Sequence, residues 1–296
     1  MPLLLINDLG LISYTDAYAL QQRLVAARKA SAIDDVLLLC EHPHVITLGR
    51  NANRSNLLAS EHVLRQKNIE LYSTNRGGDI TYHGPGQIVG YPILNLDKIK
   101  RDVGWYVRTL EEAMIRASAN FGVTAYRVLG KTGIWVVPRS LDQTASNAGT
   151  ALELAQQQSS SGGGDFSPHV GAQDYLGRQP LKSAESTATQ TRSDARLSTS
   201  DATEEKLAAI GVHISRWVTS HGFAYNVSTD LRYFDLIIPC GIADRKATSL
   251  EKFLQRPITP DEVKPHLTRH LADLIGRDPY PISREELQSQ LSAAAL

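Results

Sequence analysis

Residues 76–87 read Arg-Gly-Gly-Asp-Ile-Thr-Tyr-His-Gly-Pro-Gly-Gln, and the interpretation of the whole chain starts from them. The glycines indicate positive φ angles or a close approach of the backbone to another group. Ile80 and Tyr82 on one side and the apolar run 88–94 on the other predict two strands around a Gly-Pro-Gly turn. An ordinary glycine-rich hairpin explains the glycines, but not so many polar side chains between apolar strands. We therefore predict a binding site, since loops held by rigid strands carry function. The polar side chains are Arg76, Thr81, Tyr82, His83 and Gln87.

The composition limits the class of protein. The 31 basic and 31 acidic residues among 296 give zero formal net charge. The net charge therefore gives no indication of nucleic-acid binding. Cys40 and Cys240 are far apart in sequence and form neither a CxxC motif nor a zinc-binding spacing. We therefore expect a reducing compartment and no disulfide framework. The amino-terminal residues include no basic region, and no apolar run reaches about 18 residues, so we expect no targeting peptide and no membrane span.

Hydrophobic patterns outside the first motif predict α/β structure. Before residue 138 we expect strands at 2–6, 35–40, 45–50 and within 128–137, and helices near 14–30 and 104–121. After residue 203, strand patterns resume at 206–215 and 217–230. Thr259 and Glu262 form a capping box that begins a helix, which ends at Gly276.

The composition changes between residues 139 and 203 to Ser, Thr, Ala, Gln, Gly and Asp. Such a segment cannot bury enough apolar surface to offset the entropy of ordering it. We read it as a disordered insertion with a short helix near 148–157. An interdomain linker is the alternative, but it would leave the strand at 135–137 without the neighbour that the chain from Lys206 can supply. The prediction is one α/β domain with a mixed sheet over residues 1–280, interrupted at 139–203, and a tail at 281–296.

Cys240 is the candidate nucleophile. It stands between Pro239 and Gly241 at what reads as the exit of a strand, whereas Cys40 lies in an apolar run and reads as an inert core thiol. A thiol with an ordinary pKa of about 8.5 is mostly protonated at neutral pH, so a nucleophile needs an activating partner. A histidine would suit a Cys–His hydrolase, and a lysine would suit transfer of an acyl group onto an amine. The candidates are His83, His213, His221 and Lys206.

The chain resembles the lipoyl(octanoyl) transferases in four motifs that follow in the same order. They are residues 76–87, Lys206-Leu-Ala-Ala-Ile-Gly211, His221-Gly-Phe-Ala-Tyr-Asn-Val227 and Pro239-Cys240-Gly241. The resemblance covers residues 1–138 and 204–280. It implies the biotin/lipoate-protein-ligase-like α/β fold, a mixed β-sheet flanked by helices. It also implies the first step of lipoate cofactor biosynthesis, in which an octanoyl group passes from octanoyl-acyl carrier protein to the ε-amine of a lysine on a lipoyl domain through a cysteine thioester.

The resemblance also implies roles for individual residues. By position, Cys240 is the nucleophile and Lys206 activates it, while 133–136 form the Gly-x-Trp-Val stretch of the family. Two departures are the insertion and Asp79, which occupies a variable position. We expect the polar side chains of the first motif to hold the carbonyl end of the acyl group. The implied substrate-binding residues are Arg76, Gly77, Gly78, Asp79, Ile80, Thr81, Tyr82, His83, Ala209, Ile210, Gly211, Gly222, Phe223 and Ala224.

The implied partners are proteins. They are octanoyl-acyl carrier protein as donor, and lipoyl domains of 2-oxoacid dehydrogenase E2 subunits and glycine cleavage H protein as acceptors. The resemblance implies no cofactor and no metal. From the zero net charge and the missing targeting and membrane segments we expect no nucleic acid, no membrane and a cytoplasmic location, or the mitochondrial matrix in a eukaryote. An acidic carrier needs a basic docking surface. The candidates for it are Lys98, Lys100, Arg101, Arg50 and Arg54.

Three other functions stay open at this point. An ATP-dependent lipoate or biotin ligase of the same fold would need nucleotide contacts and no nucleophilic cysteine. A non-catalytic module would bind lipoyl domains or the carrier without forming a thioester. A Cys–His hydrolase would use one of the histidines as its base.

Overall fold

The computed structural model describes residues 2–138, 204–239 and 246–294. Within these residues, eight strands form one sheet in the order β11-β1-β2-β6-β10-β9-β8-β7, and three form a smaller sheet in the order β4-β3-β5. The strands are β1 (Leu3–Leu11), β2 (Asp35–Glu41), β3 (Val45–Leu48), β4 (Glu70–Ser73), β5 (Ile80–His83), β6 (Gln87–Ile93), β7 (Tyr126–Val128), β8 (Lys131–Val136), β9 (Glu205–Ser215), β10 (Val218–Asn226) and β11 (Asp278–Pro281). The helices are α1 (Tyr14–Lys29), α2 (Glu61–Gln66), α3 (Val103–Ala119), α5 (Leu250–Leu254), α6 (Pro260–Ile275) and α7 (Arg284–Ala293), and the 3₁₀ helices are η1 (Arg54–Asn56), η2 (Leu96–Lys98) and η3 (Leu231–Leu236).

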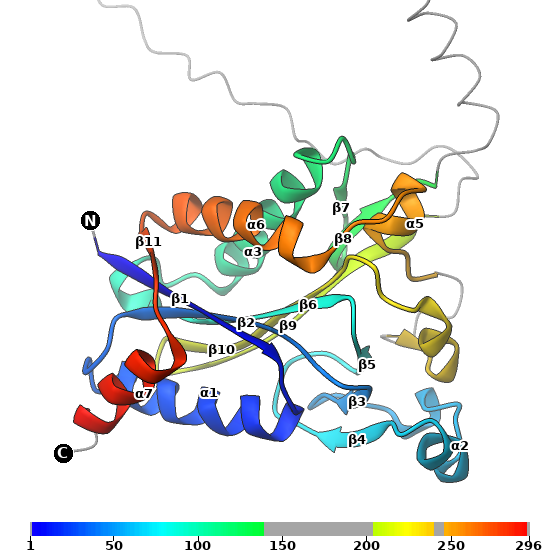
Figure 1. Cartoon of the computed structure of the whole chain (residues 1–296), viewed down its shortest axis with the longest axis horizontal. Coiled ribbons are helices and arrows are strands. Elements are labelled where there is room, and N and C mark those ends of the chain that lie inside the picture. The colour runs from blue at the N-terminus through cyan, green and yellow to red at the C-terminus, as the bar shows by residue number, and fades with distance from the viewer. Residues whose placement is uncertain (1, 139–203, 240–245, 295–296) are drawn as a thin grey trace, which may run out of the picture. The chain divides into compact units, whose positions relative to one another are not determined.

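Helices cover both faces of the larger sheet. Figure 1 shows α3 and α6 on one face and α1 and α7 on the other. Successive residues of β2 belong to opposite cores: Leu37 and Leu39 pack on the α3 side, and Leu38 and Cys40 pack on the α1 side. A continuous apolar run is what such a doubly covered strand requires. The expected α/β fold is confirmed, and the sheet is mixed, because β2 pairs parallel with β1 and antiparallel with β6.

The ends of several elements differ from the prediction. The first strand continues to Leu11. The strand expected within 128–137 is β8, and it forms a hairpin with β7, which was not predicted. The expectation of a tail from residue 281 is wrong. β11 pairs with β1, and Leu287 and Leu291 of α7 are buried in the core on the α1 side. These two leucines lie four residues apart and so share one face of a helix.

The strands on either side of residues 139–203 lie side by side. β8 pairs antiparallel with β9, with Trp135 opposite Lys206 and Val136 opposite Glu205. The neighbour that the sequence analysis expected for this strand is therefore confirmed. The insertion itself, including the helix expected near 148–157, falls outside the described residues and stays a prediction.

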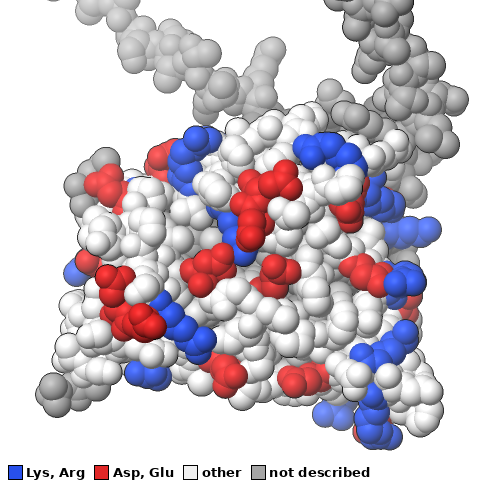
Figure 2. Space-filling view, in the orientation of Figure 1, with Lys and Arg blue, Asp and Glu red and all other residues white. Residues whose placement is uncertain are grey.

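Charges of both signs are interspersed on the face shown in Figure 2. The exposed pair of Arg65 with Glu61 and the partly buried pair of Arg116 with Glu112 each link residues four apart on a helix. In the part of the chain that the structure describes, no helix combines the length and the hydropathy needed to cross a membrane.

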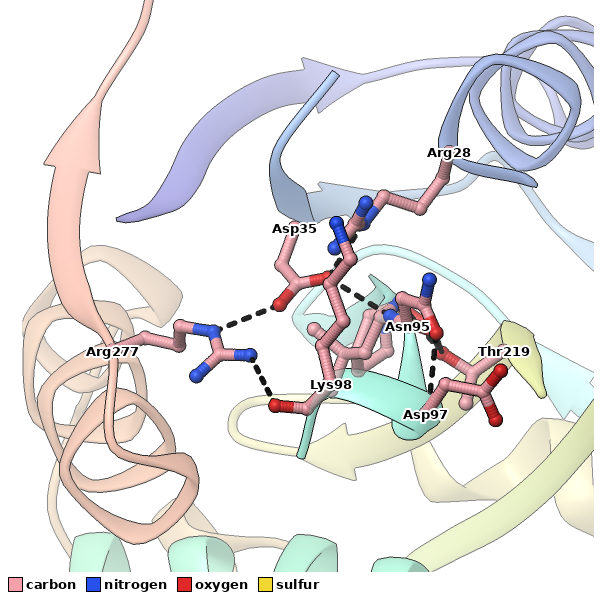
Figure 3. A network of polar contacts seen from close by, with 9 residues as sticks. Arg28, Asp35, Asn95, Asp97, Lys98, Thr219 and Arg277 are labelled. Carbon is pink, nitrogen blue, oxygen red and sulfur yellow. Dashed lines mark hydrogen bonds and ion pairs between the residues drawn. The ribbon is translucent and has the colours of Figure 1, made fainter. Parts of the chain in front are cut away.

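A buried polar network lies at one end of the central strands (Figure 3). The Asp35 carboxylate accepts hydrogen bonds from Arg28 Nε at 2.7 Å, from Arg277 Nε at 2.9 Å and from the Asn95 amide at 2.8 Å. It thereby links α1, the end of α6 and the end of β6. The cavity that Gln87 lines is at the other end of β6, where Gln87 begins the strand.

Candidate active site

Two adjacent cavities are lined by the predicted motifs. The first has an empty volume of about 500 Å³ and the second about 480 Å³. Thr81, Ala209 and Ala224 line both, so the cavities share a wall. The other residues of the first are Gln87, Trp135, Lys206, Ala208, Asn226, Phe234, Pro239, Lys246 and Ala247. The other residues of the second are Tyr14, Arg76, Gly78, His83, Val89, Tyr91, Ile210, Gly211, His221, Gly222 and Phe223.

The residues of the first motif divide between the two cavities and the protein interior. Thr81 and His83 of β5 line a cavity, whereas Ile80 and Tyr82 are fully buried in the core of the smaller sheet. This follows from the two-residue period of a strand. Of the residues expected to bind substrate, Gly77, Asp79, Ile80 and Tyr82 line neither cavity, and the others all do.

Arg76 is a buried side chain that holds the motif loop against β3. Its Nη2 donates to the Thr47 carbonyl oxygen at 2.7 Å, and its Nε donates to Thr47 Oγ1 at 3.1 Å. The loop also docks on β9, because the Gly77 amide donates to the Val212 carbonyl at 2.9 Å. A Cβ on Gly211 would lie 2.8 Å from the Gly77 carbonyl oxygen, so this approach requires a glycine. The motifs at 76–83 and 206–211 thus meet through backbone contacts.

Lys206 lies on β9, and its side chain runs along the Gly-x-Trp-Val stretch. Its Nζ is 5.1 Å from the centroid of the Trp135 ring. Gly133 has a φ of 108°, and a Cβ there would lie 2.3 Å from the Ala208 carbonyl oxygen and 3.0 Å from Lys206 Cε. The missing side chain at Gly133 therefore makes the room that the Lys206 side chain occupies.

A chain of amides connects the two cavities. His83 Nδ1 donates to Gln87 Oε1 at 2.8 Å, Gln87 Nε2 donates to Asn226 Oδ1 at 2.8 Å, and Asn226 Nδ2 donates to the Thr248 carbonyl at 2.9 Å. The Thr248 amide in turn donates to the Lys206 carbonyl at 2.9 Å, and the Lys206 amide donates to the Lys246 carbonyl at 2.8 Å. The segment after residue 245 is thereby held beside Lys206.

His221 has an unusual backbone for a residue within a strand. Its φ is 54°, and its amide donates to Gln21 Oε1 at 3.0 Å instead of to a neighbouring strand. The paired register of β10 with β6 stops at Phe223 and Gly90, just before Pro92, which has no amide hydrogen for the ladder. The ring stacks on Tyr18 and lies 2.7 Å from Asn75 Oδ1 through Nε2. The break in the ladder at Pro92 thus accompanies a histidine that lines the second cavity.

The buried histidines of the second cavity are neutral. Burial is the main cause that lowers the pKa of His83 and of His221 to about 3, and nearby Arg76 lowers both further. Neither can be the cation that activates a thiol near neutral pH, and neither lines the first cavity. His213 lines neither cavity. Among the four partners considered from the sequence, Lys206 is the one in the cavity that Pro239 lines.

Comparison with known proteins shows to which family the chain belongs. The lipoyl protein ligase A/B catalytic domain model matches residues 13–272. The octanoyltransferase of Solibacter usitatus is 40% identical over 276 residues, which cover 93% of this chain and 94% of that protein. The octanoyltransferase of Acidobacterium capsulatum is 43% identical over 250 residues, which cover 82% of this chain and 77% of that protein. The chain belongs to the octanoyltransferase family. It is an acyltransferase, as the sequence analysis expected.

The fold of this octanoyltransferase is shared with more distant ligases. A bi-partite lipoate protein ligase from Thermoplasma acidophilum matches with a TM-score of 0.61 at 13% identity, covering 99% of this chain and 92% of that one. A lipoate-protein ligase A bound with ATP matches with a TM-score of 0.57 at 14% identity, covering 99% and 93%. These matches confirm the expected lipoate-ligase-like fold.

Cys240, the nucleophile expected for an octanoyltransferase, falls outside the described residues, and its role stays a prediction. Its described neighbours Pro239 and Lys246 both line the first cavity. The expectation that a strand leads to Cys240 is wrong. Leu231–Leu236 form the 3₁₀ helix η3, and Ile237 makes only an isolated bridge with Leu57.

Sequence reasoning missed several residues that line the octanoyltransferase cavities. Tyr14 comes from α1 and Phe234 from η3, and neither carries a pattern that distinguishes it from a core residue. Tyr91 and Asn226 are polar positions within buried strands, which is a signal that could have been used. No group of three potential metal ligands gathers anywhere within the described residues.

Proposed function

We propose that this octanoyltransferase moves the octanoyl group from octanoyl-acyl carrier protein to a lysine of a lipoyl domain through a thioester on Cys240. The observation that carries the proposal is the first cavity, where Lys206 and the residue before Cys240 line one space. The 40% identity with an octanoyltransferase over nearly the full chain supports the choice of acyl group.

The reaction has two balanced transfers. The Cys240 thiolate attacks the carrier thioester, so that one carbon–sulfur bond forms, the other breaks and the carrier leaves as a thiol. A lysine ε-amine then attacks the new thioester, an amide forms and the Cys240 sulfur is released. Exchange of one thioester for another needs no ATP. Lys206 as an ammonium would favour the thiolate and supply the proton for the departing carrier, and as an amine it would accept the proton of the incoming lysine.

The environment of Lys206 supports this role. The face of an indole ring attracts a cation, and the Lys206 ammonium lies over the Trp135 ring. Trp135 is 1% exposed, and Lys206 is half-buried. An ammonium close to a thiol would lower the pKa of the thiol, since an opposite charge within a few ångströms favours the ionised form.

We place the acyl chain across the wall that the two cavities share. With the thioester beside Lys206, the chain would pass Ala209 and Ala224 and end in the second cavity. This placement differs from the expectation that the polar side chains of the first motif hold the carbonyl end. Arg76 and His83 line the second cavity only, whereas Thr81 lines both cavities. Each buried methylene would contribute about 0.8 kcal/mol to binding.

Lys98, Lys100 and Arg101, three of the candidates for the carrier docking surface, line neither cavity. Lys98 accepts a hydrogen bond through its carbonyl from Arg277, in the Asp35 network at the other end of β6 (Figure 3). Arg101 and Lys100 are paired with Asp97 and Asp102. Arg50 remains a candidate for the docking surface, because its amide donates to the Arg76 carbonyl at 2.9 Å and Arg76 lines the second cavity. Arg54 remains a candidate as well, because it follows Arg50 closely in the chain, in η1. We propose these two arginines as part of the docking surface for the acidic carrier.

Intact mass measurement tests the proposal directly. After incubation with octanoyl-acyl carrier protein, the wild type should gain one octanoyl group, and Cys240→Ser should not. Addition of a lipoyl domain should remove the adduct and octanoylate the domain. An adduct that needs ATP would favour a ligase, and no adduct under any condition would favour a binding module.

The acceptors and the compartment are also part of the proposal. We infer that lipoyl domains of E2 subunits and H protein are the acceptors, supported by the lipoate-ligase fold and the octanoyltransferase relatives. The bacterial relatives support action in the cytoplasm. Comparing octanoylation of purified E2 domain and H protein, and fractionating cells of the source organism, would test these two points.

A further inference from the structure

Asp79 belongs to the first motif but lines neither cavity. Its carboxylate is committed to the loop after β3 instead. Oδ1 accepts a hydrogen bond from the Asn53 amide at 2.9 Å, and Oδ2 accepts one from Asn56 Nδ2. Its carbonyl accepts from the Gly49 amide at 2.9 Å, so both the backbone and the side chain of Asp79 are tied to this loop.

The loop that Asp79 holds is bonded to the segment before Cys240. The Ile238 amide donates to the Asn56 carbonyl at 2.8 Å, and Leu57 bridges Ile237. The Leu58 amide donates to the Leu236 carbonyl at 2.9 Å. Residues 236–238 are therefore held by residues 56–58 along their backbone. Asn56 belongs to both sets of contacts, through its side chain to Asp79 and through its carbonyl to Ile238.

We propose that Asp79 is a positioning residue, which acts through Asn56 to fix the backbone two residues before Cys240 relative to the first motif. This inference rests on the proposed role of Cys240 as the nucleophile. It assigns to Asp79 a function other than contact with substrate. A one-ångström displacement near reacting atoms costs large factors in rate, so a residue that fixes this segment would control the acylation rate without touching the acyl group.

The polarity of the Asp79–Asn56 contact allows a reciprocal exchange. In Asp79→Asn one of the two carboxylate oxygens becomes an NH₂ group. The Asn53 amide and Asn56 Nδ2 then cannot both find an acceptor at position 79, as they do in the wild type. In the double variant Asp79→Asn with Asn56→Asp, the donor and acceptor change places, and the new amide at position 79 keeps an oxygen for the Asn53 amide. We expect Asp79→Asn to lower the rate constant of single-turnover acylation about tenfold with an unchanged donor KM. The double variant should recover most of the rate.

Alkylation of the thiol by iodoacetamide gives a readout that does not need the donor. The chain has two cysteines, and Cys40 is fully buried, so Cys40 should remain unmodified while Cys240 reacts. Displacement of Cys240 from Lys206 should shift the midpoint of the pH–rate profile for Asp79→Asn upward and leave that of the double variant near the wild type. A loss of global stability alone would not move this midpoint, and thermal unfolding of each variant would show such a loss.

Several results would overturn the inference. A raised donor KM with an unchanged alkylation profile would make Asp79 a substrate contact. Wild-type rates in Asp79→Asn, or a folded double variant as slow as the single variant, would remove the positioning role. A wild type that forms no octanoyl adduct would refute the proposed function, while the alkylation profiles would still decide whether Asp79 positions the thiol.

Discussion

Trp135 and Lys206 are opposite residues on neighbouring antiparallel strands, and the Lys206 Nζ lies 5.1 Å from the centroid of the Trp135 ring. These two residues come from either side of residues 139–203. The chemistry proposed for Lys206 therefore depends on a strand pairing that joins two halves of the chain.

The first prediction concerns this contact. Replacing Trp135 with leucine removes the ring face that favours the ammonium, and we expect the acylation rate to fall by up to about tenfold, with a smaller loss for Trp135→Phe. The pH–rate profile should also shift. The Lys131 Nζ lies 5.6 Å from the centroid of the same ring, but Lys131 lines neither cavity, so Lys131→Met serves as the control and should change the rate little. Equal losses in Trp135→Leu and Lys131→Met would contradict the prediction.

The second prediction uses two glycines of the β7–β8 hairpin. Gly130 has a φ of 75° with no atom within 4 Å of an added Cβ, whereas an added Cβ at Gly133 would lie 2.3 Å from the Ala208 carbonyl oxygen. Gly130→Ala should cost about 1–2 kcal/mol from the left-handed backbone alone, with normal acylation. Gly133→Ala should be less stable than Gly130→Ala. It should also acylate slowly, because the Lys206 side chain must move. Urea unfolding and single-turnover acylation would show both effects, and similar values for the two variants would contradict this explanation.

The third prediction concerns pH. Burial lowers the pKa of His42 to about 4 and of His83 and His221 to about 3. In the unfolded chain these groups bind protons near an ordinary pKa of about 6.5, so the unfolded state gains protons first as the pH falls. Stability should therefore be complete above about pH 6.5 and decrease below it, by up to about 1.4 kcal/mol per pH unit for each histidine. Urea unfolding between about pH 7.5 and 5 would measure this slope. It should be shallower in His83→Gln and unchanged in a variant of the exposed His62, and a flat profile in the wild type would refute the explanation.

The fourth prediction concerns the buried network in Figure 3. Asp35→Asn leaves the Arg28 and Arg277 guanidinium groups, in residues that are 4% and 8% exposed, without their shared carboxylate. We expect a loss of about 3–5 kcal/mol in the free energy of unfolding. Glu61→Gln breaks the exposed pair with Arg65 and should cost less than about 1 kcal/mol. Equal effects of the two substitutions in urea unfolding would show that burial does not decide the cost.

The sequence was sufficient for the parts of the fold that follow from periodicity. The apolar run of β2, the amphipathic helix α3 and the capping box of α6 all lie where their patterns predicted them. The site was predicted as a set of motifs, but not which of their residues line a cavity. Within the first motif this depends on which face of β5 points toward the cavities: Thr81 and His83 lie on that face, and Tyr82 lies in the core of the smaller sheet.

Other features of the site depend on contacts between distant residues, which no local pattern contains. The motif gives no indication that Asp79 binds Asn56, because a carboxylate in a glycine-rich loop suits a ligand equally well. The turn of the His221 backbone lies where the pairing of β10 with β6 stops, and the His221 amide donates to Gln21 in a helix. The placement of the basic residues also required the structure, since the separation of Lys98 from the cavities follows from the direction of β6.

The last prediction concerns the chain between β8 and β9. Val136 and Glu205 are opposite residues of these antiparallel strands, and such residues lie about 5 Å apart, so a short loop can connect them. Deletion of residues 142–202 leaves residues 137–141 and 203–204 between the two strands, which is enough for a hairpin connection. We expect this variant to keep the unfolding free energy within about 1 kcal/mol of the full chain, because the entropic cost of closing a loop depends only weakly on its length and is smaller for a shorter connection. Its octanoyl transfer should also be largely retained. A matched control replaces residues 142–202 with a Gly/Ser linker of equal length. It distinguishes the effect of the length of this segment from the effect of its sequence. Loss of folding or turnover in the deletion, with recovery in the linker chain, would show that the connection must be long, and loss in both would show that the insertion's own sequence contributes to the fold or the reaction.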